Sequence, residues 1–168
     1  MSKFKVCMLG AFAVGKTSLV QRYVHSIFNE KYQTTLGVKI DQKSLRLGDK
    51  TLDMILWDLA GEDEFINVRD TYLRGSSGGL LVADGTRAET LDIAFQLRDR
   101  LFEAVGQVPL ILVINKSDLR DQWTVDTEQF EQLREDGWQV LETSARDDSN
   151  VEAAFRALAT RLLAVNPS

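Results

Sequence analysis

Hydrophobic and polar residues repeat with two different periods along this chain, and the two periods mark strands and helices in turn. Longer segments, with apolar residues at helical spacing, lie between most of the short segments that alternate or are apolar throughout. The expected strands cover residues 4–9, 37–47, 51–58, 79–84, 109–115 and 139–143, and the expected helices cover 16–25, 88–105, 124–136 and a stretch after 149. This alternation predicts an α/β domain with a six-stranded, mostly parallel sheet and helices on both faces.

Turn and capping residues refine this expectation. Gly48 and the two residues after it separate two alternating runs, so the second and third strands should form an antiparallel hairpin at one edge of the sheet. Residues 80–83 and 110–114, in two of the later strands, are apolar throughout, as in parallel strands that are covered on both faces. Gly137 should end the third helix. Ser149 and Glu152 have the spacing of a capping box for the last one.

Composition limits the class of protein. A chain of 168 residues, 44% of them hydrophobic, can fill one core, so residues 1–168 should form a single domain. A net charge of −5, without a basic stripe, argues against nucleic-acid binding. The single cysteine, Cys7, lies in the first strand, which favours the reducing cytoplasm. We find no membrane-spanning run, secretory signal or lipid-anchor motif in this chain.

Residues 10–17, GAFAVGKT, match the phosphate-binding pattern G-x-x-x-x-G-K-[ST] between the first strand and the first helix. Glycines allow backbone N–H groups to surround an anion, Lys16 adds a positive charge beside the β and γ phosphates, and Thr17 offers a hydroxyl to Mg²⁺. A simple glycine turn is the alternative, but the flanking strand and helix favour phosphate. The residues expected to line the site are Ala13, Val14, Gly15, Lys16 and Thr17.

A D-x-x-G pattern, Asp58 to Gly61, follows the third strand. Asp58 could hold Mg²⁺, directly or through water, opposite Thr17, and the Gly61 N–H could approach a γ-phosphate because no Cβ blocks it. Asp and Gly are also common in turns for structural reasons, so this pattern is weak by itself.

A third pattern, Asn115-Lys116-Ser117-Asp118, ends the fifth strand. A carboxylate such as Asp118 can accept hydrogen bonds from both N1–H and the 2-amino group of guanine, a pair of donors that adenine lacks. The residues after the sixth strand, Ser144 and Ala145 among them, offer backbone N–H groups to the guanine O6. A polar turn would use similar residues but would not require this order. All three patterns fall beyond the carboxyl ends of strands, where ligands bind in this fold class.

With these motifs in this order, the chain resembles a small GTPase of the Ras superfamily over essentially its whole length, and it is most similar to the Rab-like branch. WDLAGEDEF at 57–65 is similar to the Rab sequence WDTAGQERF, YLRG at 72–75 to YYRG, and TLGV at 35–38 to TIGV. The resemblance implies the small G domain of the P-loop NTPases, GTP and GDP as ligands, Mg²⁺, and a conformational switch in the cytoplasm.

The resemblance also assigns roles to individual residues. Thr35 would close on Mg²⁺ when a γ-phosphate is present, with Thr34 as the rival ligand. Phe28 would lie against the guanine, unless it is a core residue. Lys116 would lay its stem across the base, and Ser18 would help to hold the α-phosphate. Residues 29–39 and 60–75 would be the surfaces for effector, exchange-factor and activating proteins.

Two residues depart from the family pattern. Glu62 stands where the family has the glutamine that orients the attacking water. The expected catalytic residues are therefore Glu62, Lys16, Thr35 and Gly61. Its charge would repel the transferring phosphoryl group by about 3 kcal/mol at about 5 Å and a dielectric of about 20, so we expect slow hydrolysis. A Glu62 with a raised pKa could instead be a general base. Phe12 would crowd an arginine supplied by an activating protein. A GTP/GDP-binding scaffold with negligible hydrolysis is therefore the alternative function.

Overall fold

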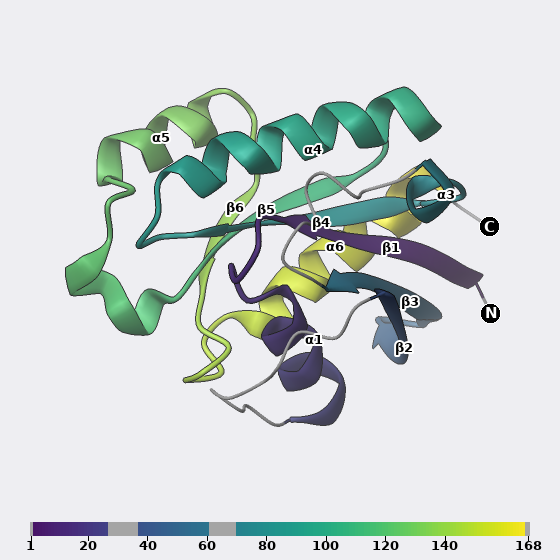
Figure 1. The fold of residues 1–168 in the computed structure, drawn as a ribbon. Coiled ribbons are helices and arrows are strands. Elements are labelled where there is room, and N and C mark those ends of the chain that lie inside the picture. Colours follow the sequence, from purple (N-terminus) through teal and green to yellow (C-terminus); the bar gives the residue numbers. More distant parts are fainter. Residues whose placement is uncertain (1, 27–36, 61–69, 167–168) are drawn as a thin grey trace.

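The computed structural model describes residues 2–26, 37–60 and 70–166. Within them a six-stranded sheet, in the order β2-β3-β1-β4-β5-β6, carries helices on both faces (Figure 1). β2 and β3 pair antiparallel, and every other neighbouring pair is parallel. The strands are β1 (Ser2–Gly10), β2 (Gly37–Leu47), β3 (Lys50–Ala60), β4 (Gly78–Asp84), β5 (Leu110–Asn115) and β6 (Val140–Thr143). The expected fold class, with its one antiparallel edge, is confirmed.

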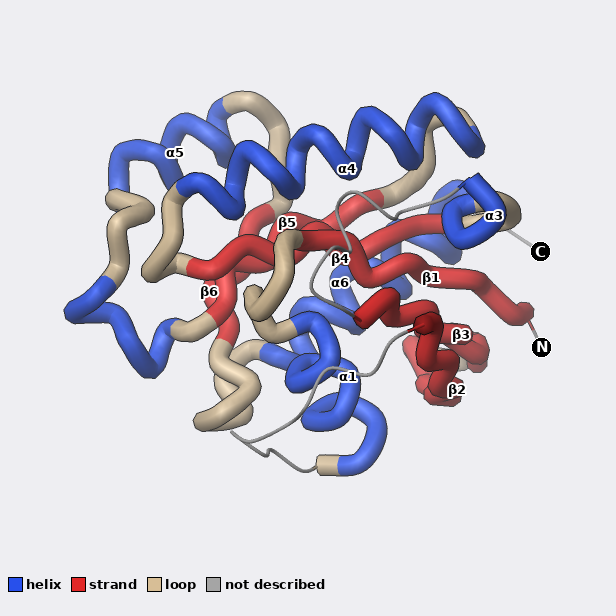
Figure 2. The backbone as a smooth tube through the Cα atoms, in the orientation of Figure 1, coloured by secondary structure: helices blue, strands red, loops and turns tan. Residues whose placement is uncertain are grey.

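Of the α-helices in the described residues, two cover one face of the sheet and three the other (Figures 1 and 2). The first face carries α1 (Lys16–His25) and α6 (Val151–Val165), and the second carries α3 (Asp70–Leu73), α4 (Glu89–Val105) and α5 (Thr127–Glu135). A 3₁₀ helix, η1 (Ser117–Gln122), follows β5. Neither α3 nor η1 has an apolar repeat long enough to be expected from the sequence. Among the described residues, no helix is long and apolar enough to cross a membrane.

The core lies in two layers because successive side chains of β1 point to opposite faces. Val6 and Met8 pack with α1 and α6, whereas Cys7 and Leu9 pack with α4. Every residue of β4 and β5 is buried, as expected for apolar parallel strands. The two helices on the first face also contact each other through the stacked rings of Tyr23 and Phe155, whose centroids are 4.1 Å apart.

The starts of two helices differ from the sequence-based expectation. The Ser149–Glu152 capping box is wrong: α6 begins at Val151, and Ser149 lies outside it because its backbone pairs with Ser144. α5 begins at Thr127 rather than 124, since the N–H of Thr124 donates to the carbonyl of Gly85. The helix is capped instead by a reciprocal pair of hydrogen bonds between Asp126 and Gln129.

Two turns are as expected. Gly137 ends α5 with a positive φ of 97°, and its N–H donates to Arg134 O at 3.1 Å. Gly48, also at positive φ, lies in the turn of the β2–β3 hairpin, where Leu47 pairs with Lys50.

Candidate nucleotide-binding site

The phosphate-binding pattern forms a tight loop between β1 and α1, and both of its glycines are required by close contacts. A Cβ on Gly10 would lie 2.4 Å from the carbonyl oxygen of Val82, and a Cβ on Gly15 would lie 2.2 Å from the side-chain nitrogen of Asn115. Gly15 also has a φ of 106°, which residues with a Cβ rarely adopt. The loop is therefore pressed against the ends of β4 and β5.

Lys16 begins α1, and its ammonium group turns back onto the loop. Its Nζ donates to Gly10 O at 3.0 Å and to Ala11 O at 3.1 Å, and the side chain is buried. The positive charge and the N-terminal end of α1 thus lie together at the loop. Both favour an anion at this position.

Thr17 and Asp58 meet beside this loop. Thr17 Oγ1 donates to Asp58 Oδ2 at 2.5 Å, and among the described residues no hydrogen-bond partner is found for the other carboxylate oxygen, Oδ1. Burial raises the pKa of Asp58, and the hydrogen bond from Thr17 and the charge of Lys16 offset this only in part. A half-buried hydroxyl and a buried carboxylate with an unpaired oxygen are suitable ligands for Mg²⁺.

The described residues contain no cluster of three or more His, Cys, Asp or Glu side chains that could hold a metal. A magnesium ion at Thr17 and Asp58 would therefore need oxygens from phosphate and water to complete its shell. Mg²⁺ ordinarily binds nucleotides in this way, through one or two protein ligands together with the phosphates.

The Asn115-Lys116 pair, expected to bind the base, is bonded directly to the phosphate loop. Asn115 Nδ2 donates to Val14 O at 3.0 Å, while its Oδ1 accepts from Thr143 Oγ1 at 3.0 Å. Lys116 Nζ donates to Ala13 O at 3.0 Å. The two motifs, about one hundred residues apart in the sequence, therefore form a single site. In this structure the amide of Asn115 ties the loop to β6.

Asp118 and Ser144 join the segment after β5 to the loop after β6, where guanine is expected to bind. Ser144 Oγ donates to Asp118 Oδ1 at 2.8 Å, and its backbone N–H donates to Ser149 O at 3.0 Å. The Ser144 N–H, one of the two expected donors to guanine O6, is thus engaged within the loop after β6 in this structure. The Ala145 N–H has no hydrogen bond to the described residues, so it is the better candidate.

Asp84, at the end of β4, is a site residue that the sequence reasoning missed. Its buried carboxylate accepts hydrogen bonds from Thr86, and Oδ2 lies 2.8 Å from Lys116 Nζ and 3.1 Å from Arg87 Nε. Arg87 Nη2 in turn donates to Phe12 O at 2.7 Å. One carboxylate therefore orients two cations that each hold a carbonyl of the phosphate loop.

Hydrogen bonding keeps Asp84 ionised. Burial raises the pKa of this carboxyl group, but the hydrogen bonds from Lys116 and Thr86 outweigh it and lower the pKa overall. One signal for this residue is present in the sequence, since Asp84 is the first polar residue after an apolar strand whose end lies beside the other motifs.

Several expected site residues lie outside the described residues, namely Phe28, Thr34, Thr35, Gly61 and Glu62. Ser18 lies in the first turn of α1. The Phe12 side chain is 37% exposed on the phosphate loop. The expectation that this ring crowds an arginine supplied by an activating protein stays a prediction.

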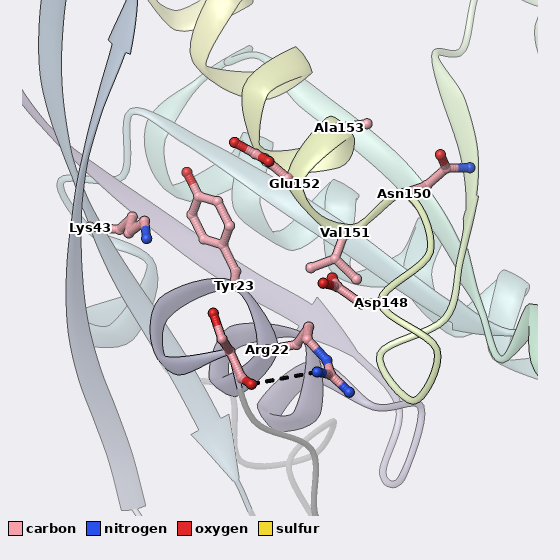
Figure 3. A pocket seen from close by; sticks show the side chains of 9 residues that line it. Arg22, Tyr23, Lys43, Asp148, Asn150, Val151, Glu152 and Ala153 are labelled. Atoms are coloured by element: carbon pink, nitrogen blue, oxygen red, sulfur yellow. Dashed lines mark hydrogen bonds between the residues drawn. The ribbon is translucent and has the colours of Figure 1, made fainter.

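A separate pocket of about 320 Å³ lies between α1, β2 and the start of α6 (Figure 3). Arg22, Tyr23, Lys43 and Glu152 are among the residues that line it. It contains none of the expected phosphate or base ligands, so it is distinct from the candidate site.

Comparison of the sequence with known proteins identifies related chains. The family model described as "Ras family" matches residues 5–164. The Ras-related protein Rab-7b of Homo sapiens is 37% identical over 163 residues, which are 95% of this chain and 82% of that protein. The Ras-related protein Rab-32 of Mus musculus is 34% identical over 171 residues, covering 96% and 76% of the two chains. The Ras-related protein RABA4b of Arabidopsis thaliana is 37% identical over 161 residues, covering 95% and 72%.

Proposed function

Because the chain belongs to the Ras family of small GTP-binding proteins, we propose that it is a molecular switch that cycles between GTP and GDP and hydrolyses GTP slowly. The observation that carries this proposal is the direct bonding of Asn115 and Lys116 to the carbonyls of Val14 and Ala13. A phosphate cradle and a base-reading motif that share hydrogen bonds can hold the two ends of one nucleotide.

At the phosphate end, the Lys16 ammonium and the backbone N–H groups of the loop neutralise the β and γ phosphates. Thr17 and Asp58 fit Mg²⁺, which when bound would supply further positive charge to the phosphate oxygens. Thr35 and the Gly61 N–H complete the γ-phosphate contacts in this proposal, so their segments respond to its loss.

At the base end, Asp118 accepts from N1–H and the 2-amino group of guanine. The Ala145 N–H donates to O6. Lys116 is held between Ala13 O and Asp84, which places its aliphatic stem beside the phosphate loop. This set of one acceptor pair and one donor matches guanine and not adenine.

Slow hydrolysis follows from Glu62. A carboxylate accepts hydrogen bonds from water but cannot donate one to the charge that develops on the phosphoryl group, whereas glutamine can do both. Phe12, exposed on the loop, would further hinder an arginine brought by an activating protein. Turnover then depends on the phosphate loop, Lys16 and Mg²⁺, without help from a glutamine or an added arginine.

Partners would bind at residues 29–39 and 60–75 and read their conformation. The described part of the first surface supports this proposal, because Val38 is 44% exposed and the adjoining Ile40 is 53% exposed on the edge strand β2. Exposed apolar side chains on a sheet edge are suited to a protein contact. We propose a cytoplasmic protein.

Two measurements on the purified protein test the proposal. The nucleotide released on denaturation is identified, and single-turnover release of phosphate from GTP is then followed. GDP on the protein with slow but measurable phosphate release supports a switch. GTP on the protein with no release would instead identify a scaffold that only binds the nucleotide. Failure to bind any guanine nucleotide would refute both.

A further inference from the structure

The side chain of Arg22 connects α1 to the loop after β6. Its Nε donates to Ala145 O at 2.8 Å, and its Nη2 donates to Arg146 O at 2.8 Å. Figure 3 shows this side chain extending from α1 toward the loop that carries Asp148 and Asn150. A planar guanidinium that holds two successive carbonyls restricts both of their peptide groups.

The same loop is held from two other directions. Ser144 Oγ donates to Asp118 Oδ1, and it accepts from Asp147 N at 2.9 Å. The carbonyl of Ser144 accepts from Ser149 N at 2.9 Å. Because N–H and C=O lie on opposite sides of a trans peptide, this bond directs the Ala145 N–H away from Ser149. Ser149 therefore holds the peptide group before Ala145, and Arg22 holds the one after it.

Arg22 also has a fixed relation to the phosphate end of the site. It belongs to α1, which begins at Lys16, so it lies six residues or about 9 Å further along the same helix. A helix is a rigid spacer over this length. The phosphate loop and the loop after β6 are thus both connected to α1, the first at the start of the helix and the second through Arg22.

We propose that Arg22 is a positioning residue for recognition of the 6-oxo group of guanine. This inference rests on the proposed nucleotide-binding function. Arg22 does not contact the nucleotide; it fixes Ala145, whose N–H donates to O6. It therefore contributes to discrimination at position 6 of the purine, and it leaves discrimination at position 2, which belongs to Asp118, unchanged.

The test measures dissociation constants for three diphosphates on the wild type, Arg22→Gln and Arg22→Lys. GDP has both groups, and inosine diphosphate lacks only the 2-amino group. 2-Aminopurine riboside diphosphate lacks the 6-oxo group and also the N1–H, which is a donor to Asp118. That second loss is the same in every variant, so a change in this preference on substitution of Arg22 reports the contact to O6. Arg46→Gln is the control, because Arg46 Nε also donates to a backbone carbonyl, Gly48 O at 2.9 Å, but in the distant β2–β3 hairpin. Thermal unfolding establishes that each variant is folded.

In Arg22→Gln, the preference for GDP over the 2-aminopurine nucleotide should fall about threefold to tenfold, the contribution of about one hydrogen bond. Arg22→Lys retains one charged donor and should show a smaller loss. The preference for GDP over inosine diphosphate should stay the same, and Arg46→Gln should match the wild type in both ratios.

A folded Arg22→Gln or Arg22→Lys that weakens all three nucleotides equally would overturn the inference, since that result describes a purely structural clamp. A wild type that binds GDP without any preference at position 6 would also overturn it, while leaving GTP binding intact. A wild type that binds none of the three would refute the proposed function, and the inference with it.

Discussion

The carboxylate of Asp84 offers the strongest test of how the site is held together. Asp84→Asn keeps the shape of the side chain but removes its charge, and only one of its two terminal atoms then accepts a hydrogen bond. Lys116 and Arg87 would lose their common partner, so their grip on Ala13 O and Phe12 O should loosen. We expect weaker nucleotide binding, although Asp84 itself makes no contact with the nucleotide in the proposed site.

The magnitude follows from the geometry. A hydrogen bond to a charged group contributes about 1.5–3 kcal/mol. The Lys116 and Arg87 side chains are 31% and 37% exposed, so solvent screens both contacts. After that discount, Asp84→Asn should weaken GDP binding by about 1–2 kcal/mol, a factor of about 5–30.

The assay is the dissociation rate and affinity of a fluorescent GDP analogue. Asp53→Asn is the matched control, because Asp53 is also a buried carboxylate bonded to a neighbouring hydroxyl, that of Ser44, but near the other end of the sheet. GDP affinity that is unchanged in a folded Asp84→Asn, or reduced equally in Asp53→Asn, would refute the reasoning.

The pKa of Asp84 adds a pH dependence with a definite sign. Its pKa is lowered in the folded protein, so its contribution to stability is fully present above the unfolded pKa and is lost as the pH falls through the folded pKa. The difference in unfolding free energy between the wild type and Asp84→Asn should therefore be constant near neutral pH. It should shrink below about pH 4, near the reference pKa of an aspartate.

The remaining predictions concern the metal, the reaction and the base. The pKa of Asp58 is raised in the folded protein, so its ionised form lowers the stability once the pH exceeds the unfolded pKa. In EDTA at neutral pH, Asp58→Asn should therefore raise the thermal midpoint of the nucleotide-free protein by a few degrees. The same variant should weaken Mg²⁺-dependent GTP binding at least tenfold. A lower midpoint would contradict the burial argument. Glu62→Gln should increase single-turnover GTP hydrolysis roughly tenfold or more, because it removes the repulsion and adds a donor, whereas an unchanged or slower rate would favour a general base. Asp118→Asn should weaken GTP by roughly a hundredfold and improve binding of xanthosine triphosphate, as competition assays would show; retained GTP affinity would exclude Asp118 as the base reader.

The fold could be read from the sequence wherever local pattern and tertiary environment agree. β4 and β5 are apolar up to their last residues because helices cover both faces, and the turn at Gly48 supplies the positive φ that a hairpin requires. The start of α6 could not be read in this way. Ser149 has the right side chain for a cap, but its backbone is engaged by Ser144, a contact that no local pattern reveals.

In the candidate site too, residues in local motifs could be predicted from the sequence, and residues outside any motif could not. Residues 10–17 and 115–118 were predictable because each motif needs fixed spacing within one loop. Asp84 and Arg22 belong to no motif, and their partners lie between 2 and 124 residues away in the chain. Their roles emerge only when parallel strands bring the loop ends together, so a single sequence gives little indication of them.

The bonds from Asn115 and Lys116 to the phosphate loop have a consequence for ligands smaller than a nucleotide. Each half of the site is built partly from the other, so neither behaves as an autonomous receptor. Guanosine and pyrophosphate, added as separate molecules, should each bind more weakly than GDP, because the bond between ribose and phosphate that raises the effective concentration of the second group is absent. We therefore expect the covalent bond between ribose and phosphate to contribute to affinity beyond the contacts made by the nucleoside and the phosphates alone.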